Sequence, residues 1–402
     1  MVMSMHNEDV SAGFDERADL LAVQGGNSFR IRAYRRAAAG CGQCQRGGSV
    51  VEAQHGWTER VRTAIGLALL AVLFGMPFDA AAQTLREQNE LLFHQLQQIH
   101  GLSDAEMRDI RAIFSRSPVL GQGNPAISQH PVTPEQCAAK RKEQGVDDAN
   151  AQFERICGGK YMAPLYDPKT ATADQAKACI DQFEFPDIPC AYPVVWVKAR
   201  EAAQICEAQG KRLCDAHEWE GACAGSLEPA DYRFDLAQGV APETAVQRMR
   251  SAHNAAHQAD KTWSYGPEYQ RGICATASFK TPGCPGGGWQ LCGSNTYPAG
   301  DFPACRSPLD VYDLNGNAAE HMNLPLNPQQ MSSLGSKELG YTEMKGSWFI
   351  FDTYRAHEDW CRWRAPFWHG SRVMDTGSHA NYHLGFRCCK TLGPQTPLLL
   401  RK

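Results

Sequence analysis

Two histidines four residues apart are the first side chains whose type and spacing could do chemistry. His253 and His257 stand in the stretch His-Asn-Ala-Ala-His. A helix would place both imidazoles on one face, within reach of a single metal ion. The third ligand would come from elsewhere, with Glu243, Asp260 and His217 as candidates. Histidines in a polar stretch are more often solvated than ligating, so this pair alone does not predict a metal.

The aromatic and basic segment 355–372 is a second candidate site. It contains three tryptophans, two histidines and four arginines. Exposed side chains of these types stack on sugars or peptides and pair with carboxylates or sulfates. In the competing interpretation the tryptophans fill the core and the arginines cap loop carbonyls, and the sequence does not choose between the two. The predicted ligand-binding residues are Trp348, His357, Trp360, Arg362, Trp363, Arg364 and His369.

The composition limits the kind of protein that carries these residues. The chain has 402 residues, and 40 Lys and Arg against 44 Asp and Glu give a net charge of −4. A protein that coats nucleic acid needs a basic field, so we expect no nucleic-acid partner. The 16 Cys, 36 Gly, 23 Pro and 9 Trp predict a loop-rich fold held by cross-links and large aromatic side chains.

An apolar run near residue 70 predicts the compartment. Arg60 and Arg62 precede the run 64–74, and small residues ending at Ala82 follow it, which is the pattern of a secretory signal peptide over 57–82. The run is too short to span a bilayer. We therefore expect an exported protein, periplasmic or extracellular, without a stable membrane span. Fourteen cysteines follow residue 82, and this even number favours up to seven disulfides.

The first 56 residues precede this signal and need a separate interpretation. The run from Phe29 to Ala37, Phe-Arg-Ile-Arg-Ala-Tyr-Arg-Arg-Ala, follows a predicted helix. Residues 8–40 resemble the opening helices of family-X DNA polymerases, without the catalytic carboxylates of those enzymes. We interpret residues 1–56 as a non-native or fused leader. The single pair Cys41 and Cys44 supplies at most half of a zinc site.

Helical spacing marks the start of the predicted mature chain. Leu85, Leu92 and Leu96 fall on one face, and Ser103 with Glu106 forms a capping box before a second apolar stripe. These features predict a helical hairpin over 83–116. Pro and Gly density predicts a linker, which continues as a Cys-containing connector over 117–159. The main domain is expected at 160–392, with a tail at 393–402.

A series of motifs runs through the main domain over about 210 residues. They are Ile180-Asp-Gln-Phe-Glu-Phe185, the block from Tyr192 to Cys223 with Gly-Lys-Arg-Leu inside it, Asp310 to Glu320 with Leu-Asn-Gly-Asn, Lys345-Gly-Ser-Trp348, Cys361-Arg and Leu384-Gly-Phe-Arg-Cys388. In type and order they resemble the motifs of the formylglycine-generating enzyme, or sulfatase-modifying factor, family. The resemblance implies an irregular, loop-rich α+β fold related to the C-type lectins, with a helix at about 198–208.

The resemblance also implies two structural disulfides. They join Cys206 to Cys388 and Cys223 to Cys361. Three further pairs are expected from proximity alone. Cys214 and Cys389 each lie near one member of the pair Cys206 and Cys388, and the other two pairs are Cys274 with Cys305 and Cys284 with Cys292.

Copper is the cofactor of the family's oxidases, which hold copper(I) between two cysteines spaced five apart, shortly after the Gly-Gly-Ser-Tyr/Trp segment. Soft thiolates suit copper(I). The corresponding stretch 349–360 contains no cysteine, and Cys361 matches the family's structural cysteine better. Distant relatives that use non-haem iron hold it in a separate helical domain, which is absent here. We therefore expect neither copper nor iron.

Calcium is the cofactor that the sequence favours. The family binds it with a side-chain oxygen, two backbone carbonyls and a Glu around a Gly-Asn turn. The matching residues are Asp313, Gly316, Ala318 and Glu320. Oxygen donors at this spacing suit a hard cation. The competing interpretation is an Asn-Gly turn with a solvent-facing Glu and no metal.

Two functions remain open. The first is an exported binding or scaffold module that keeps the fold, disulfides and calcium and presents an aromatic, arginine-rich face to a protein, peptide or glycan. The alternative is an oxidoreductase that acts on a thiol with a non-standard metal site. The missing cysteine pair favours the first.

Overall fold

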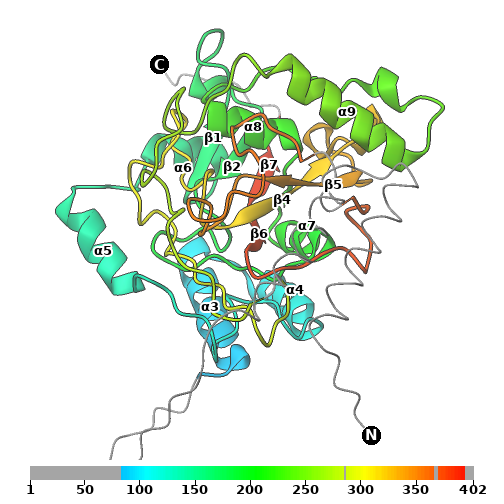
Figure 1. The fold of residues 1–402 in the computed structure, drawn as a ribbon. Coiled ribbons are helices and arrows are strands. Elements are labelled where there is room, and N and C mark those ends of the chain that lie inside the picture. Colours follow the sequence, from blue (N-terminus) through cyan, green and yellow to red (C-terminus); the bar gives the residue numbers. More distant parts are fainter. Residues whose placement is uncertain (1–82, 285–286, 366–369, 394–402) are drawn as a thin grey trace, which may run out of the picture. The chain divides into compact units, whose positions relative to one another are not determined.

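The computed structural model describes residues 83–284, 287–365 and 370–393, which belong to one compact unit (Figure 1). The predicted leader 1–56, the predicted signal peptide 57–82 and nearly all of the tail lie outside the described residues. Within the described part of the chain, every helix is too short or too polar to span a bilayer.

Two helices open the described chain. They are α3 (Leu85–His100) and α4 (Asp104–Ser115), and each begins with a complete capping box, at Thr84 and at Ser103. Their apolar faces pack together with α7 (Ala199–Ala208) in one buried cluster. The pair of helices therefore shares its core with the rest of the domain.

The segment 117–159, expected to be a linker and connector, contains two helices. They are α5 (Pro134–Glu143), capped by Thr133, and α6 (Ala151–Cys157), capped by Asn150. The disulfides Cys137–Cys190 and Cys157–Cys179, which the sequence did not predict, tie these helices to the domain. Local caps and two covalent links fix the segment in spite of its Pro and Gly residues.

Two small sheets form the centre of the fold. The antiparallel sheet has the order β1-β2-β7-β3, and the other sheet has the order β5-β4-β6 with β4 and β6 parallel. A single residue, Arg387, separates β6 from β7. These two consecutive strands therefore connect the two sheets, since β6 belongs to one and β7 to the other. The strands are β1 (Met162–Leu165), β2 (Ala178–Asp181), β3 (Arg212–Leu213), β4 (Ala319–Leu324), β5 (Tyr341–Lys345), β6 (Leu384–Phe386) and β7 (Cys388–Thr391).

The remaining helices lie around these sheets and are joined by long loops. Short strands with extensive loop structure make this an α+β domain, as the sequence predicted. The helices are α8 (Ala216–Ala224) and α9 (Pro242–Ala256), and the 3-10 turns are η1 (Ala173–Gln175), η2 (Phe234–Ala237), η3 (Pro328–Gln330) and η4 (Ser332–Leu334).

Disulfides pair all fourteen cysteines of the described residues. Two have the partners that the resemblance implied, Cys206 with Cys388 and Cys223 with Cys361. Three have the partners expected from proximity, and these are Cys214–Cys389, Cys274–Cys305 and Cys284–Cys292.

The neighbouring bridges Cys206–Cys388 and Cys214–Cys389 are expected to stabilise the fold redundantly. Each spans more than 170 residues, but with one bridge intact the other closes a loop of only about ten residues. Replacing either pair by alanine should lower the free energy of unfolding by roughly 2 to 3 kcal/mol. Replacing both should cost about 1 to 2 kcal/mol more than the sum.

Chemical denaturation of the two double variants and the quadruple variant measures these terms. Additive losses would show that the two bridges do not restrain the same loop. The pair Cys284–Cys292, which closes a loop of eight residues far from both, is the control, because its removal should add independently.

Candidate functional site

The loop 349–360 is the stretch in which the sequence resemblance placed copper ligands. It follows β5 and the Gly-Ser-Trp348 turn, and it contains no cysteine. The nearest cysteine in the sequence, Cys361, forms a disulfide with Cys223. Since every cysteine among the described residues is in a disulfide, the chain offers no pair of thiolates there, and the residues present do not fit copper(I).

The predicted ligand-binding residues divide into a buried and a half-buried group. Trp348 and Trp360 are 2% exposed and Arg364 is fully buried, so the expectation that these three form an exposed face is corrected. They pack in the core because large aromatic side chains fill a loop-rich domain. His357, Arg362 and Trp363 are half-buried, and His369 lies outside the described residues.

Three of these predicted residues form one aromatic cluster. His357 is stacked parallel on Trp363 with ring centroids 4.9 Å apart, and Trp348 meets His357 edge-on with centroids 5.1 Å apart. Burial lowers the pKa of His357 to about 4, so its ring is neutral at pH 7. The aromatic cluster anchors the loop 349–358 through His357.

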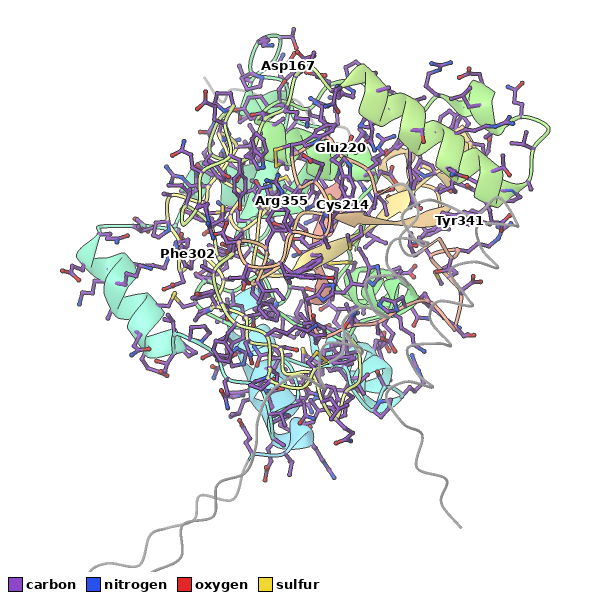
Figure 2. All side chains as sticks on the ribbon, in the orientation of Figure 1. Asp167, Cys214, Glu220, Phe302, Tyr341 and Arg355 are labelled. Atoms are coloured by element: carbon purple, nitrogen blue, oxygen red, sulfur yellow. A yellow bond between two sulfur atoms is a disulfide. The ribbon has the colours of Figure 1, made fainter. Side chains whose placement is uncertain are left out.

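A group of side chains from this loop and from the segment 269–280 is called here the loop patch. Tyr354 is 60% exposed, and the Lys280 ammonium lies 5.8 Å from its ring centroid. Arg355, labelled in Figure 2, lies over the ring of Tyr269 at 4.9 Å. The loop patch consists of Tyr269, Arg271, Lys280, Tyr354 and Arg355.

Asp352 holds the loop patch together. Its carboxylate accepts a 2.6 Å hydrogen bond from the Tyr269 hydroxyl and lies 3.3 Å from the Arg271 guanidinium. Arg355 also lies 3.8 Å from Glu358, which offsets part of the positive charge. Sequence reasoning included Arg355 in the segment 355–372 but missed the residues from 269–280, because no spacing links that divergent stretch to the loop.

The predicted calcium turn lies inside the domain. Glu320 is buried, so the competing interpretation of a solvent-facing Glu is wrong. Its carboxylate accepts hydrogen bonds of 2.7 to 3.0 Å from Arg387 and one of 2.8 Å from the Trp219 indole. These donors occupy both oxygens of Glu320, so in this arrangement Glu320 does not offer a free ligand atom.

Asp313 fits a cation better. One of its oxygens accepts from the Gly300 amide, and the other is buried with no hydrogen-bond partner among the described residues. Burial raises the pKa of Asp313 to about 7. Burial, followed by repulsion from Asp313 and Glu320, raises the pKa of Glu184 well above its usual value. Three buried carboxylates thus share mainly one guanidinium, that of Arg387, and this excess of negative charge suits a bound cation.

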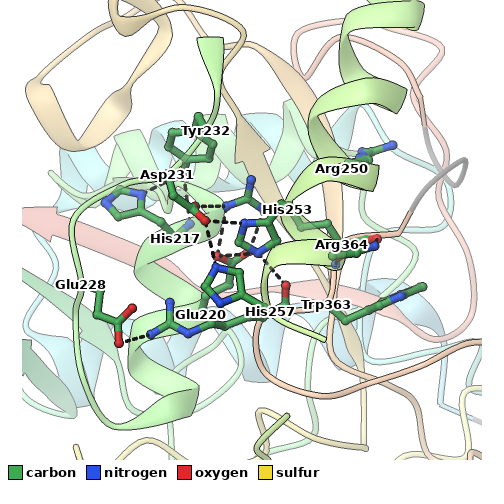
Figure 3. A network of polar contacts seen from close by, with 12 residues as sticks. His217, Glu220, Glu228, Asp231, Tyr232, Arg250, His253, His257, Trp363 and Arg364 are labelled. Atoms are coloured by element: carbon green, nitrogen blue, oxygen red, sulfur yellow. Dashed lines mark hydrogen bonds and ion pairs between the residues drawn. The ribbon is translucent and has the colours of Figure 1, made fainter. Parts of the chain in front are cut away.

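A second buried polar centre lies between α8, β5 and residues 362–364 (Figure 3). Glu220 accepts hydrogen bonds of 2.8 and 3.1 Å from Arg364 and one of 3.1 Å from Lys345. All three side chains are at most 1% exposed. Burial alone would raise the pKa of Glu220, but Arg364 and Lys345 hold it well below its usual range.

The histidine pair lies next to this centre, on α9. The Asp231 carboxylate oxygen Oδ2 is 2.8 Å from His253 Nδ1 and 2.9 Å from His257 Nε2, as Figure 3 shows. His253 is buried, which corrects the expectation of a solvated pair. Asp231 thus takes the place expected for a third ligand, and no regular spacing pointed to it because it lies 22 residues before His253 in a loop.

The residues named as candidate third ligands have other contacts. Glu243 accepts a hydrogen bond from the Tyr341 hydroxyl at 3.1 Å. The imidazole of His217 lies 2.8 Å from the Tyr232 hydroxyl. The backbone N–H of Asp260 donates a hydrogen bond to the His257 carbonyl.

The fold and the site define a disulfide-rich α+β domain whose two sheets meet at a Gly-Phe-Arg strand. Residues 124–392 match the sulfatase-modifying factor enzyme 1-like domain, which is more than half of the chain, and the protein belongs to that family. The match includes α5 and α6 and so begins before residue 160. No curated protein matches the sequence.

Replacing Glu220 by glutamine tests the buried centre. The substitution keeps the shape of the side chain but leaves Arg364 and Lys345 without their shared counter-charge. We expect a loss of about 3 to 5 kcal/mol in the free energy of unfolding. Thermal and chemical denaturation measure it.

The control for this variant is Glu228→Gln. Glu228 pairs with Arg362 at 3.1 Å, but its side chain is 48% exposed, so the loss should stay below about 1 kcal/mol. Equal losses in the two variants would contradict the role assigned to Glu220.

Proposed function

We propose that the protein is an exported ligand-binding module of the sulfatase-modifying factor family that does not use the family's copper chemistry. The observation that carries this proposal is the loop 349–360, which contains no thiol and lies among cysteines that are all in disulfides. Aromatic side chains lie in this loop, at the position where the resemblance places copper in the family's oxidases.

The loop patch supplies the binding chemistry of this module. Tyr354 offers an exposed ring for stacking on a sugar or peptide, and Arg271, Lys280 and Arg355 offer charged donors for carboxylates or sulfates. The aromatic cluster of Trp348, His357 and Trp363 holds the loop in place, which lowers the entropy cost of binding. The ligand is therefore an acidic glycan or peptide.

The compartment and the detailed fold are part of the same proposal. Seven disulfides support an oxidising compartment, in line with a signal peptide at 57–82. Small sheets joined by long ordered loops support a fold related to the C-type lectins.

Calcium is proposed as the stabilising ion of the turn 313–320. Asp313, with its unpartnered buried oxygen, would be the principal side-chain ligand, and the carbonyls of Gly316 and Ala318 would complete the set. Glu320 would contribute chiefly through its charge, because Arg387 and Trp219 hold its oxygens.

Stability as a function of pH tests the turn. A carboxyl with a raised pKa stabilises the fold in its protonated form, so that stability is lost as pH rises from about 4 through 7. Without a cation, we expect the unfolding midpoint to be roughly 4 to 8 °C lower at pH 8 than at pH 5.5. Millimolar calcium should remove most of this difference.

The variant Asp313→Asn is the control for this experiment. It should lose both the pH dependence and the response to calcium. A calcium response that persists in Asp313→Asn would place the ion elsewhere.

Ligand binding tests the loop patch. We expect heparin to bind the wild-type protein and desulfated heparin to bind at least about tenfold more weakly. The double variant Tyr354→Ala, Arg355→Ala should reduce heparin affinity about tenfold, because it removes one stacking ring and one guanidinium. Arg108→Ala on α4, an exposed arginine outside the patch, should leave affinity unchanged.

A second measurement separates the proposal from the oxidase. A cysteine-containing sulfatase peptide incubated with the protein, copper and oxygen should remain unmodified. Formation of formylglycine in that peptide would overturn the proposed function.

A further inference from the structure

Three side chains at the C-terminal end of α9 and in the loop before it converge on one point. They are Asp231, His253 and His257, whose facing oxygen and nitrogen atoms all lie within 4.8 Å of one another. The two imidazole centroids are 4.5 Å apart. Figure 3 shows the Asp231 carboxylate facing both rings, with a dashed contact to each.

The hydrogen bond on the far side of His253 fixes which ring nitrogen faces this point. His253 Nε2 lies 2.7 Å from the carbonyl oxygen of Arg362, and a carbonyl can only accept. Nε2 therefore carries a hydrogen. In the neutral ring, Nδ1 is then an unprotonated lone pair 2.8 Å from the Asp231 oxygen. A cation bound by both atoms satisfies this arrangement, and so does a second hydrogen on the ring.

Two of the three proposed ligands, His253 and Asp231, have the outer contacts that support metal ligands. A metal-bound histidine commonly donates its other N–H to a carbonyl, as His253 does. A ligating carboxylate is commonly held through its second oxygen, and Asp231 Oδ1 lies 3.3 Å from the Arg364 guanidinium. Arg364 is itself fixed by Glu220, so the buried centre orients the group.

The helix α9 carries His253 in its last turn, and His257 is its C-cap residue. Val246 and Met249 are buried on the same helix, and Arg250 donates a 2.6 Å hydrogen bond to Glu343. Residues four apart on this helix lie one above the other, which is why both rings reach the same point.

The opposite side of the point is open to solvent. The His253 side chain is fully buried, but that of His257 is 18% exposed and that of Asp231 is 40% exposed. Two imidazoles and one carboxylate with an open position form a donor set for a divalent transition-metal ion, since calcium prefers oxygen ligands only.

We propose that Asp231, His253 and His257 bind one divalent transition-metal ion of the zinc class, with the fourth position open to water or to a ligand carboxylate. Zinc bonds of about 2.0 to 2.2 Å in a tetrahedral site place ligand atoms about 3.3 Å apart. The two distances from the Asp231 oxygen to the histidine nitrogens, 2.8 and 2.9 Å, need to open by roughly 0.5 Å, which the 40% exposed Asp231 side chain permits.

Zinc titration of the untagged full chain tests the site. Calcium stays in all solutions after chelator treatment, so the turn at Asp313 does not confound the result. We expect one equivalent of zinc to bind with micromolar or tighter affinity in calorimetry. Cobalt(II), used as a spectroscopic substitute, should give the visible absorption of a four-coordinate site.

Two variants and a control complete the test. His257→Ala and Asp231→Asn should each weaken zinc binding at least about 100-fold. His94→Ala, an exposed histidine on α3, should bind zinc as the wild type does. Unfolding without zinc verifies that the variants remain folded, and Asp231→Asn keeps an oxygen that can accept the histidine hydrogen bonds.

A wild-type protein that binds no zinc at micromolar concentration would overturn the site. Zinc affinity that is equal in His257→Ala, Asp231→Asn and the wild type would do the same, because the ion would then lie elsewhere. In either case, a protonated His253 paired with Asp231 would account for the geometry.

Discussion

The ion pair between Glu320 and Arg387 is the interaction on which the rest of the structure depends. Both side chains are buried, and their shortest contact is 2.7 Å. The Arg387 guanidinium also donates to the carbonyls of Asp181, Gln182 and Tyr312, so it joins the end of β2 to the turn 313–320. Because Arg387 is the one residue between β6 and β7, this pair ties both sheets together.

The same pair explains why two candidate ion sites differ in kind. At the turn, Arg387 neutralises Glu320 and leaves Asp313 and Glu184 with excess negative charge in a closed interior, an environment for a hard cation. At α9, Arg364 and Lys345 already balance Glu220, and the remaining ligands are the buried His253 imidazole and the partly exposed side chains of His257 and Asp231. One side chain, Arg364, thus links core stability to the geometry of the histidine site.

The sequence predicted those features that depend on motifs or local spacing. The family, the α+β class and the partners of Cys206 and Cys223 followed from the family's sequence motifs. The capping boxes located the first helices. It could not predict contacts between segments without a shared motif. Asp231 beside His253, and Tyr269 beneath Arg355, are brought together only by the path of long loops. Burial of Trp348, Trp360 and Arg364 was equally open, since aromatic and basic residues suit both a core and a binding face.

The position of β6 and β7 in the chain has a consequence for the order of folding. These strands come from residues 384–391, yet β7 lies between β2 and β3, and β6 pairs with β4. Neither sheet can form all of its strand pairs until the last part of the polypeptide is made. The disulfides of Cys206 and Cys214 likewise cannot form until Cys388 and Cys389 have been synthesised. The contacts with the greatest sequence separation therefore form last, which predicts slow folding and an open, reducible chain until synthesis is nearly complete.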